Sequence, residues 1–324
     1  MAYRRFLAYN VAGGVGWVVI RDPGRRDPAR AEEAVSGPLS GLAAVVGALP
    51  PPLAAWVGCR LGDLAYVSLA RRRRLALANL AAAFPELAPQ RRRRLCREAF
   101  QHLGLVAVEL AGVLHRPVPA TLAGLRIDGL DRLEEVMKRH GRALALSAHL
   151  GNWEMLALAH RLTPYRLAVV VRPLDSPGLQ ALAERARLKT GVEVIAKRQA
   201  LGPVLRALAA GRIVGILLDQ NATRREGVFV PFFGRPASTS RALAVLALRT
   251  RTPIVPIFAR RERIGLHRIV VEPPLALPDT GEVDQAVLEL TAACARAIER
   301  AVRQTPEQWL WMHDRWRTRP ASGA

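Results

Sequence analysis

The chain is poor in the residues that build metal sites and disulfide frameworks. Its three cysteines, Cys59, Cys96 and Cys294, lie far apart and form no Cys-x-x-Cys pair. Neither a structural zinc site nor a set of disulfides is therefore predicted. A His-Glu-x-x-His sequence is also absent, so the usual zinc-protease pattern is excluded. We expect this protein to work without a metal ion and without another cofactor.

Lysine is scarce, although the chain is strongly basic. The sequence has 48 lysines and arginines against 27 acidic residues, a net charge of +21, yet Lys138, Lys189 and Lys197 are its only lysines. The positive charge indicates an anionic partner, such as a phosphate group, an acidic lipid, an acidic protein or a nucleic acid. The arginine runs at 71–74 and 91–94 lack the interleaved aromatic and glycine residues of RNA-binding surfaces. We therefore expect no nucleic-acid partner.

A clear membrane span is also missing. Residues 1–36, which we treat as an N-terminal extension, contain an apolar stretch that is too short to cross a bilayer and has no small-residue cleavage site. Residues 37–74 are almost free of charge until the arginines at their end, and prolines at 50–52 divide them. This pattern predicts an apolar helical hairpin that associates with the membrane, because each arginine beside it attracts anionic headgroups by about 1 kcal/mol. A hairpin buried in the core is the alternative.

Short apolar runs alternate with helix-like segments from residue 142 onwards. The runs after the first lie at 167–171, 192–196, 213–219, 253–259 and 268–274. This alternation predicts an α/β domain with a mostly parallel central sheet flanked by helices, which we place within residues 75–320. Functional side chains of such sheets gather at the carboxyl ends of the strands, where His149, Arg172 and Asp219 fall.

The segment SAHLGNWEM, residues 147–155, carries the most informative histidine. Gly151 permits a sharp turn after His149, Asn152 is a candidate N-cap, and Glu154 falls in the first helical turn. From there the Glu154 carboxylate can turn back to the imidazole, fix its tautomer and stabilise its protonated form, as in a general base with an orienting acid. Asp219 is a possible second carboxylate for the same ring. A lone histidine at a strand end is, however, more often structural.

Further candidates for substrate binding follow later in the chain. Gln220 comes directly after Asp219 and is predicted to face the same cleft. The segment FVPFFGRPASTSR leads into a predicted helix, where backbone amides and Arg241 can hold a phosphate group. The candidates in this segment are Phe233, Gly234, Ser238 and Arg241. Its phenylalanines can equally belong to the core.

Several sequence blocks together resemble one enzyme family. HLGNWE is similar to the H-x4-[D/E] motif of the glycerolipid and lysophospholipid acyltransferase superfamily, and its GNW core resembles the bacterial lipid A biosynthesis acyltransferases, the lauroyl and myristoyl transferases. Further blocks appear in that family's order: NLAAAFPEL, VVRPLDSP, LLDQNA, GVFVPFFGRPASTSRALAVLALRT, PIVPIF and WMHDRWRTRP. The resemblance covers roughly residues 40 to 320.

The resemblance implies a glycerolipid acyltransferase-like fold and a membrane-associated enzyme at the cytoplasmic face of the bacterial inner membrane. Such an enzyme moves a fatty acyl chain from a thioester, on acyl carrier protein or coenzyme A, to a hydroxyl of a lipid A precursor or a similar glycolipid or phospholipid. His149 and Glu154 match the motif's catalytic pair, with Gly151 and Asn152 between them. Arg172 matches the family arginine that binds an anionic group of the acceptor.

The mechanism and the alternatives follow from the same residues. No Gly-x-Ser-x-Gly sequence is present, so we expect direct attack on the thioester without an acyl-enzyme. The acceptor can instead be a phosphatidylinositol mannoside or another phospholipid. A different class of function is a non-catalytic lipid-binding membrane protein on the same fold. The presence of His149, Glu154 and Arg172 together argues against that class.

Overall fold

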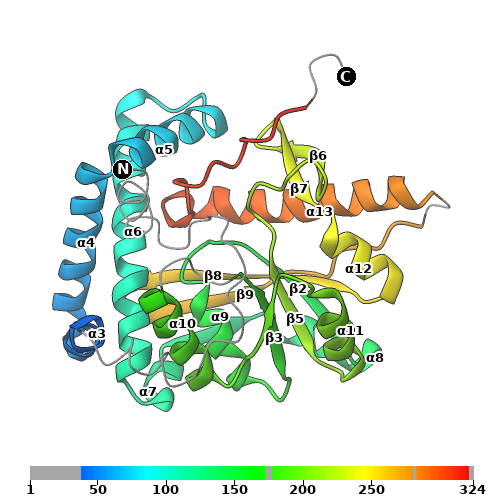
Figure 1. Cartoon of the computed structure of the whole chain (residues 1–324), viewed down its shortest axis with the longest axis horizontal. Helices are drawn as coiled ribbons and strands as arrows, with labels where there is room; N and C mark the ends of the chain where they lie inside the picture. Colours follow the sequence, from blue (N-terminus) through cyan, green and yellow to red (C-terminus); the bar gives the residue numbers. More distant parts are fainter. Residues whose placement is uncertain (1–37, 173–176, 280–281, 321–324) are drawn as a thin grey trace.

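A computed structural model describes residues 38–172, 177–279 and 282–320 of the chain. A seven-stranded sheet of order β1-β9-β8-β2-β5-β3-β4 lies at its centre (Figure 1). The strands are β1 (Leu125–Asp128), β2 (Ala143–Ser147), β3 (Leu167–Val171), β4 (Glu193–Ala196), β5 (Ile213–Leu217), β8 (Ile254–Arg263) and β9 (Leu266–Val271). Neighbouring strands run parallel except β8 and β9, which form an antiparallel hairpin. The predicted α/β fold with a mostly parallel sheet is confirmed.

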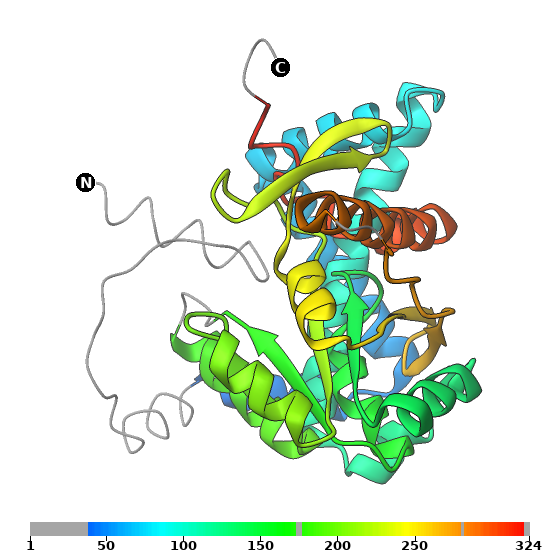
Figure 2. The same cartoon turned by 90° about the vertical axis from the view of Figure 1, so that its right-hand side faces the viewer.

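Helices cover both faces of this sheet (Figures 1 and 2). Alternate residues of β2 enter two different cores, because successive side chains of a strand point to opposite faces. One core contains residues of α8 (Leu130–His140) and α9 (Glu154–Ala159), and the other contains residues of α11 (Leu201–Ala209), α12 (Ala242–Thr250) and α13 (Val283–Gln304). Strands that are covered on both faces have continuous apolar sequences, so the sequence analysis predicted the strands of this sheet other than β1.

The remaining elements frame the sheet. They are α3 (Pro38–Ala48), α4 (Pro51–Ser68), α5 (Ala70–Ala83), α6 (Pro89–His115), α7 (Val118–Leu122), α10 (Pro177–Thr190) and the 3-10 turns His160–Leu162 and Pro306–Gln308. A two-stranded antiparallel ribbon, β6 (Gly227–Phe232) and β7 (Arg235–Ser240), packs on α13. The sequence analysis predicted neither this ribbon nor β1. The ribbon packs on α13, and this long-range contact cannot be predicted from the local sequence.

The structure differs from the predicted hairpin of residues 37–74. Helices α3 and α4 each pack along α6 rather than along one another. Glycines allow α4 and α6 to approach closely, because a Cβ atom on Gly62 would lie 2.3 Å from the Cα of Gln101, and one on Gly104 would lie 2.1 Å from the carbonyl oxygen of Gly58. The searched residues contain no helix that is both long and apolar enough to cross a membrane. The predicted extension at 1–36 lies outside the described residues.

We predict that Gly62→Ala destabilises the fold by separating α4 from α6. Overpacking a close contact costs about 1–3 kcal/mol, which exceeds the gain of roughly 1 kcal/mol from replacing a helical glycine by alanine. Gly112→Ala, on α6, is the matched control, because apart from its chain neighbours and the nearby backbone of its own helix no described atom lies within 4 Å of its added Cβ. Thermal unfolding should show a lower midpoint than wild type for Gly62→Ala and an unchanged or higher midpoint for Gly112→Ala. An equal effect of both substitutions would contradict the close-packing argument.

Candidate functional site

His149 and Asp219 meet beyond the carboxyl ends of two adjacent central strands. Ser147, the last residue of β2, pairs in register with Leu217, the last residue of β5. Because the two strands are parallel and end together, the residue two positions after each end lies at the same edge of the sheet. The tertiary structure therefore brings together two residues that are 70 positions apart in the sequence.

The Asp219 carboxylate accepts three hydrogen bonds in a buried position. His149 Nδ1 lies 2.8 Å from Oδ1, the His149 backbone N–H donates to Oδ2 at 3.0 Å, and Trp309 Nε1 donates to Oδ2 at 2.9 Å. Burial acts to raise the pKa of Asp219, but the charge of His149 and the hydrogen bonds from His149 and Trp309 outweigh it and lower the pKa to about 2. An ionised carboxylate accepts only, so the imidazole Nδ1 carries a proton, and in the neutral form of the ring the lone pair is then on Nε2.

Glu154 does not contact the imidazole of His149. It begins α9, and its Oε1 lies 3.4 Å from the guanidinium of Arg187 on α10. The carboxylate hydrogen-bonded to the histidine ring in this structure is Asp219, whereas the sequence analysis favoured Glu154 and treated Asp219 as a second possibility. Glu154 still lines the cavity described below. The short helix α9 carries its side chain towards α10 instead of back to the preceding loop.

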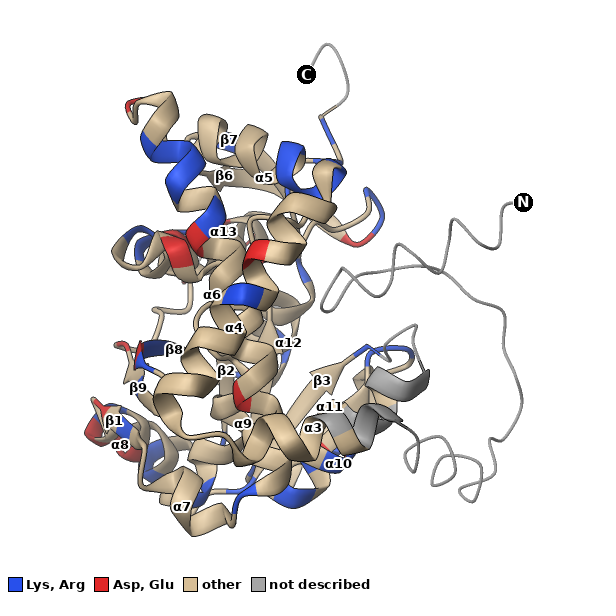
Figure 3. Cartoon of the chain, turned by 90° about the vertical axis from the view of Figure 1, so that its left-hand side faces the viewer, with Lys and Arg blue, Asp and Glu red and all other residues tan. Residues whose placement is uncertain are grey.

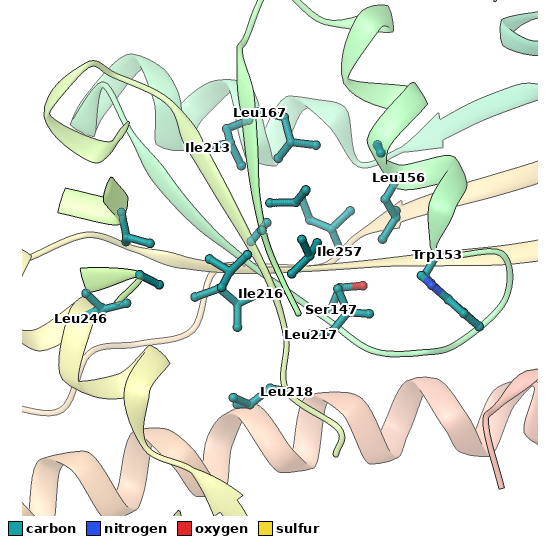
Figure 4. A pocket seen from close by; sticks show the side chains of 18 of the residues that line it. Ser147, Trp153, Leu156, Leu167, Ile213, Ile216, Leu217, Leu218, Leu246 and Ile257 are labelled. Carbon is teal, nitrogen blue, oxygen red and sulfur yellow. The ribbon is translucent and has the colours of Figure 1, made fainter. Parts of the chain in front are cut away.

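A cavity of about 780 Å³ opens beside His149. Most of its wall is apolar and comes from β2, β3, β5, α9, α11 and α12. Figure 4 shows labelled side chains of this wall from β2, β3, β5, α9 and α12. The last residues of β3 and β5 are half-buried although both strands are interior, because the helices leave this part of the sheet uncovered. The polar residues of the wall include Ser147, Glu154, Arg172, Arg187, Lys197, Gln220 and Asn221. The size and composition of the cavity are typical of a small-molecule site.

Two predicted residues of the histidine loop face away from the cavity. Gly151 has a φ of +58°, and a Cβ atom there would lie 2.0 Å from the carbonyl oxygen of Ala259, so glycine is required. Asn152 is fully buried and does not cap α9, since its Nδ2 donates to Glu109 Oε2 at 2.8 Å. The loop is thus held from behind by packing and by one buried carboxylate.

That carboxylate belongs to a buried polar cluster that the sequence analysis missed. Arg261 donates to both oxygens of Glu109, at 2.9 and 2.7 Å, and His267 Nε2 lies 3.2 Å from Oε1. Burial acts to raise the pKa of Glu109, but the hydrogen bonds from His267 and Arg261 hold it well below its usual range. The sequence does contain one indication of this cluster. Glu109 is the only charged residue of the apolar run GLVAVELAGVL, and a buried charge in such a helix requires a buried partner.

The C-terminal segment closes the site from a third direction. The Gly151 backbone N–H donates to the carbonyl oxygen of Gln308 at 3.0 Å, and Leu150 forms a bridge with Trp309. Gln308 also bonds the backbone of Arg261 through both its amide oxygen and its amide nitrogen. A segment 160 residues after the histidine therefore fixes the histidine loop and the ionised carboxylate together.

The other predicted residues divide into two groups. Arg172 and Gln220 line the cavity, and Gln220 Nε2 lies 3.5 Å from His149 Nε2. Among the described residues, the lining does not include Phe233, Gly234, Ser238 or Arg241. Phe233 sits at the turn of the β6–β7 ribbon and packs edge-on against aromatic rings of the core. Phe233 lies outside the cavity wall because the ribbon that carries it packs on α13.

We predict that Glu109→Gln destabilises the protein by about 3 kcal/mol, because breaking a buried ion pair leaves a buried guanidinium without its counter-charge. The side chains of Glu109 and Arg261 are each 5% exposed. Glu135→Gln is the control, since its pair with Arg139 is more than two-thirds exposed and should contribute less than about 1 kcal/mol. Urea unfolding measures both. Similar losses for the two variants would show that burial does not set the strength of the Glu109 pair.

Comparison with known proteins identifies the family of this chain. Residues 39–318 match the sequence model of the family described as bacterial lipid A biosynthesis acyltransferase. The chain is 28% identical over 283 residues to the lipid A biosynthesis lauroyltransferase of Escherichia coli (strain K12), covering 86% of this chain and 90% of that protein. The palmitoleoyltransferase of the same strain is 26% identical over 274 residues, covering 84% and 87%, and its myristoyltransferase is 23% identical over 281 residues, covering 86% of each chain. The chain belongs to the bacterial lipid A biosynthesis acyltransferase family and is an acyltransferase.

Proposed function

We propose that this protein transfers a fatty acyl chain from a carrier thioester to a hydroxyl of a lipid A precursor, with His149 as the general base. The observation that carries the proposal is the position of the His149–Asp219 pair beside a large apolar cavity. An acyl chain fills such a cavity, and its thioester carbon then lies next to the imidazole. The names of the related proteins support lipid A as the acceptor class.

The His149 ring is arranged to move one proton twice. Its Nε2 accepts the proton of the acceptor hydroxyl as the oxygen attacks the thioester carbon. The buried Asp219 carboxylate stabilises the resulting imidazolium and keeps Nδ1 protonated. The carbon–sulfur bond then breaks, and Nε2–H protonates the departing thiolate. The acyl chain ends on the acceptor oxygen and the histidine returns to its neutral form.

Positive charge at the cavity suits the anionic parts of both substrates. Arg172, Lys197 and Arg187 contribute to the wall. A donor on acyl carrier protein or coenzyme A brings phosphate groups, and so does a lipid A precursor. We propose that Arg172 binds an anionic group of the acceptor, because a guanidinium forms paired, charge-assisted hydrogen bonds with phosphate.

We also propose that α4 holds the enzyme on the cytoplasmic face of the inner membrane. Its exposed side carries Leu53, Trp56, Leu64 and Val67, which are 46%, 61%, 65% and 69% exposed. Figure 3 shows few charges along α4, whereas arginines gather on α5 and at the start of α6. An apolar stripe beside clustered arginines is the pattern of a helix that lies in an anionic membrane surface.

We predict that His149→Ala and Asp219→Asn each lower the catalytic constant kcat by at least about 100-fold, because a positioned general base contributes on the order of 10²- to 10⁴-fold. Glu154→Gln should have a smaller effect on kcat, since Glu154 pairs with Arg187 and not with the ring. The assay follows transfer of a lauroyl group to a lipid A precursor by mass spectrometry, after circular dichroism has confirmed folding. The double variant His149→Ala with Asp219→Asn should lose little more than either single one. Near-normal turnover by folded His149→Ala would refute the proposed mechanism.

We predict that replacing Trp56, Leu64 and Val67 by serine releases the protein from vesicles that contain anionic phospholipid. Each substitution removes roughly 1.5–3 kcal/mol of binding free energy, because one apolar side chain is no longer buried in the bilayer surface. Serine at Val194, Val283 and Leu288, which are exposed on other elements, is the matched control. Sedimentation with vesicles at low and high salt measures binding. Equal retention of the two triple variants would show that α4 is not the membrane-binding surface.

A further inference from the structure

One hydroxyl in the cavity wall has no hydrogen-bond partner. Ser147 is the last residue of β2 and is 3% exposed, and its Oγ bonds to no described residue. It nevertheless lines the cavity. Figure 4 shows its oxygen directed towards the side where Trp153 lies. Trp153 in turn packs edge-on against His149, with the ring centres 5.1 Å apart.

The fold places this hydroxyl between the apolar wall and the imidazole. Ala145, Ser147, Gly215 and Leu217 line the cavity from β2 and β5, and the register pairs Ala145 with Gly215 and Ser147 with Leu217. Ser147 is therefore the last strand residue on this wall before His149. Two residues of a strand span about 7 Å, so a chain lying along the strands has its head beside Ser147 and His149 at the same time.

Packing does not explain a serine at this position. The other residues of β2 are alanine and leucine, and a buried hydroxyl without a partner is less favourable than a methyl group. Buried polar atoms are almost always hydrogen-bonded in native proteins, so an exception inside a substrate cavity indicates a bond that forms only with the substrate. The hydroxyl is also not arranged as a nucleophile, because no described group is placed to accept its proton.

We infer that the Ser147 hydroxyl donates a hydrogen bond to the thioester carbonyl oxygen and holds the negative charge that develops on it. This inference rests on the proposed acyl transfer. When the acceptor oxygen bonds to the thioester carbon, the carbonyl electron pair moves to its oxygen and the acceptor proton moves to His149 Nε2. Ser147 Oγ–H stabilises that oxyanion. The electron pair then re-forms the carbonyl, the thiolate leaves, and His149 returns the proton to it.

The test is Ser147→Ala, measured with lauroyl-carrier protein and lauroyl-coenzyme A as donors and a lipid A precursor as acceptor. We expect kcat to fall by about 10- to 100-fold with little change in the Michaelis constant KM for the donor, because the bond strengthens only as the oxyanion forms. The midpoint of thermal unfolding should stay the same or rise, since an unsatisfied polar atom has been removed. Ser147→Cys, which keeps a weak donor, should retain an intermediate rate.

Thr121→Val is the matched control. The Thr121 hydroxyl on α7 is also buried without a partner, but it lines a separate cavity of about 70 Å³. This variant should keep the wild-type kcat. A Ser147→Ala enzyme with kcat within twofold of wild type, or with a change confined to KM, would overturn the inference. A fall in kcat together with a lower unfolding midpoint would also overturn it, because the hydroxyl would then be structural. If wild-type protein turned over no acyl thioester, the proposed function itself would fail.

Discussion

The site depends on one buried carboxylate that the fold keeps ionised. Asp219 accepts hydrogen bonds from the ring and the backbone of His149 and from the indole of Trp309. Three donors outweigh the cost of burying the charge, which is why the pKa of Asp219 falls to about 2 despite its burial. The same bonds fix the position of the imidazole and the nitrogen that carries its proton. Removing the carboxylate would therefore disturb both the geometry and the electrostatics of the histidine.

The surroundings of this pair come from parts of the chain that are distant in sequence. Helix α6 supplies Glu109, which holds the histidine loop through Asn152 and pairs with Arg261 of β8. The segment after α13 supplies Gln308 and Trp309, which hold the loop and Asp219. The Glu109–Arg261 ion pair and the bonds of Asn152 and Gln308 join α6, β8 and the histidine loop, although Asn152 Oδ1 and His267 Nδ1 have no hydrogen-bond partner among the described residues. The histidine loop is accordingly held from behind, while His149 lines the cavity.

The cavity and the His149–Asp219 pair both lie at the carboxyl ends of the same central strands. Interior strands end next to one another, and the helices leave their last residues half-covered. In the proposed reaction the uncovered apolar surface accepts the acyl chain, while the loops just beyond the strand ends carry His149 and Asp219. The proposed transfer from a thioester requires a water-poor wall next to a general base, because water competes with the acceptor for the same carbon. The Ser147 hydroxyl, which has no hydrogen-bond partner among the described residues, lies where these two surfaces join.

The sequence by itself determined the alternation of strands and helices and the strand-end position of His149, because both follow from local hydrophobic patterns. It also determined the family, because contiguous motifs identify it. Tertiary structure decided which carboxylate contacts the imidazole. Glu154 is near His149 in sequence but turns to Arg187, whereas Asp219 reaches the ring because β2 and β5 are neighbours that end in register. It also decided that Phe233 belongs to an aromatic core and that Glu109 is a buried partner of Arg261. Contacts between segments far apart in the chain depend on strand order and helix packing, and no local pattern specifies them.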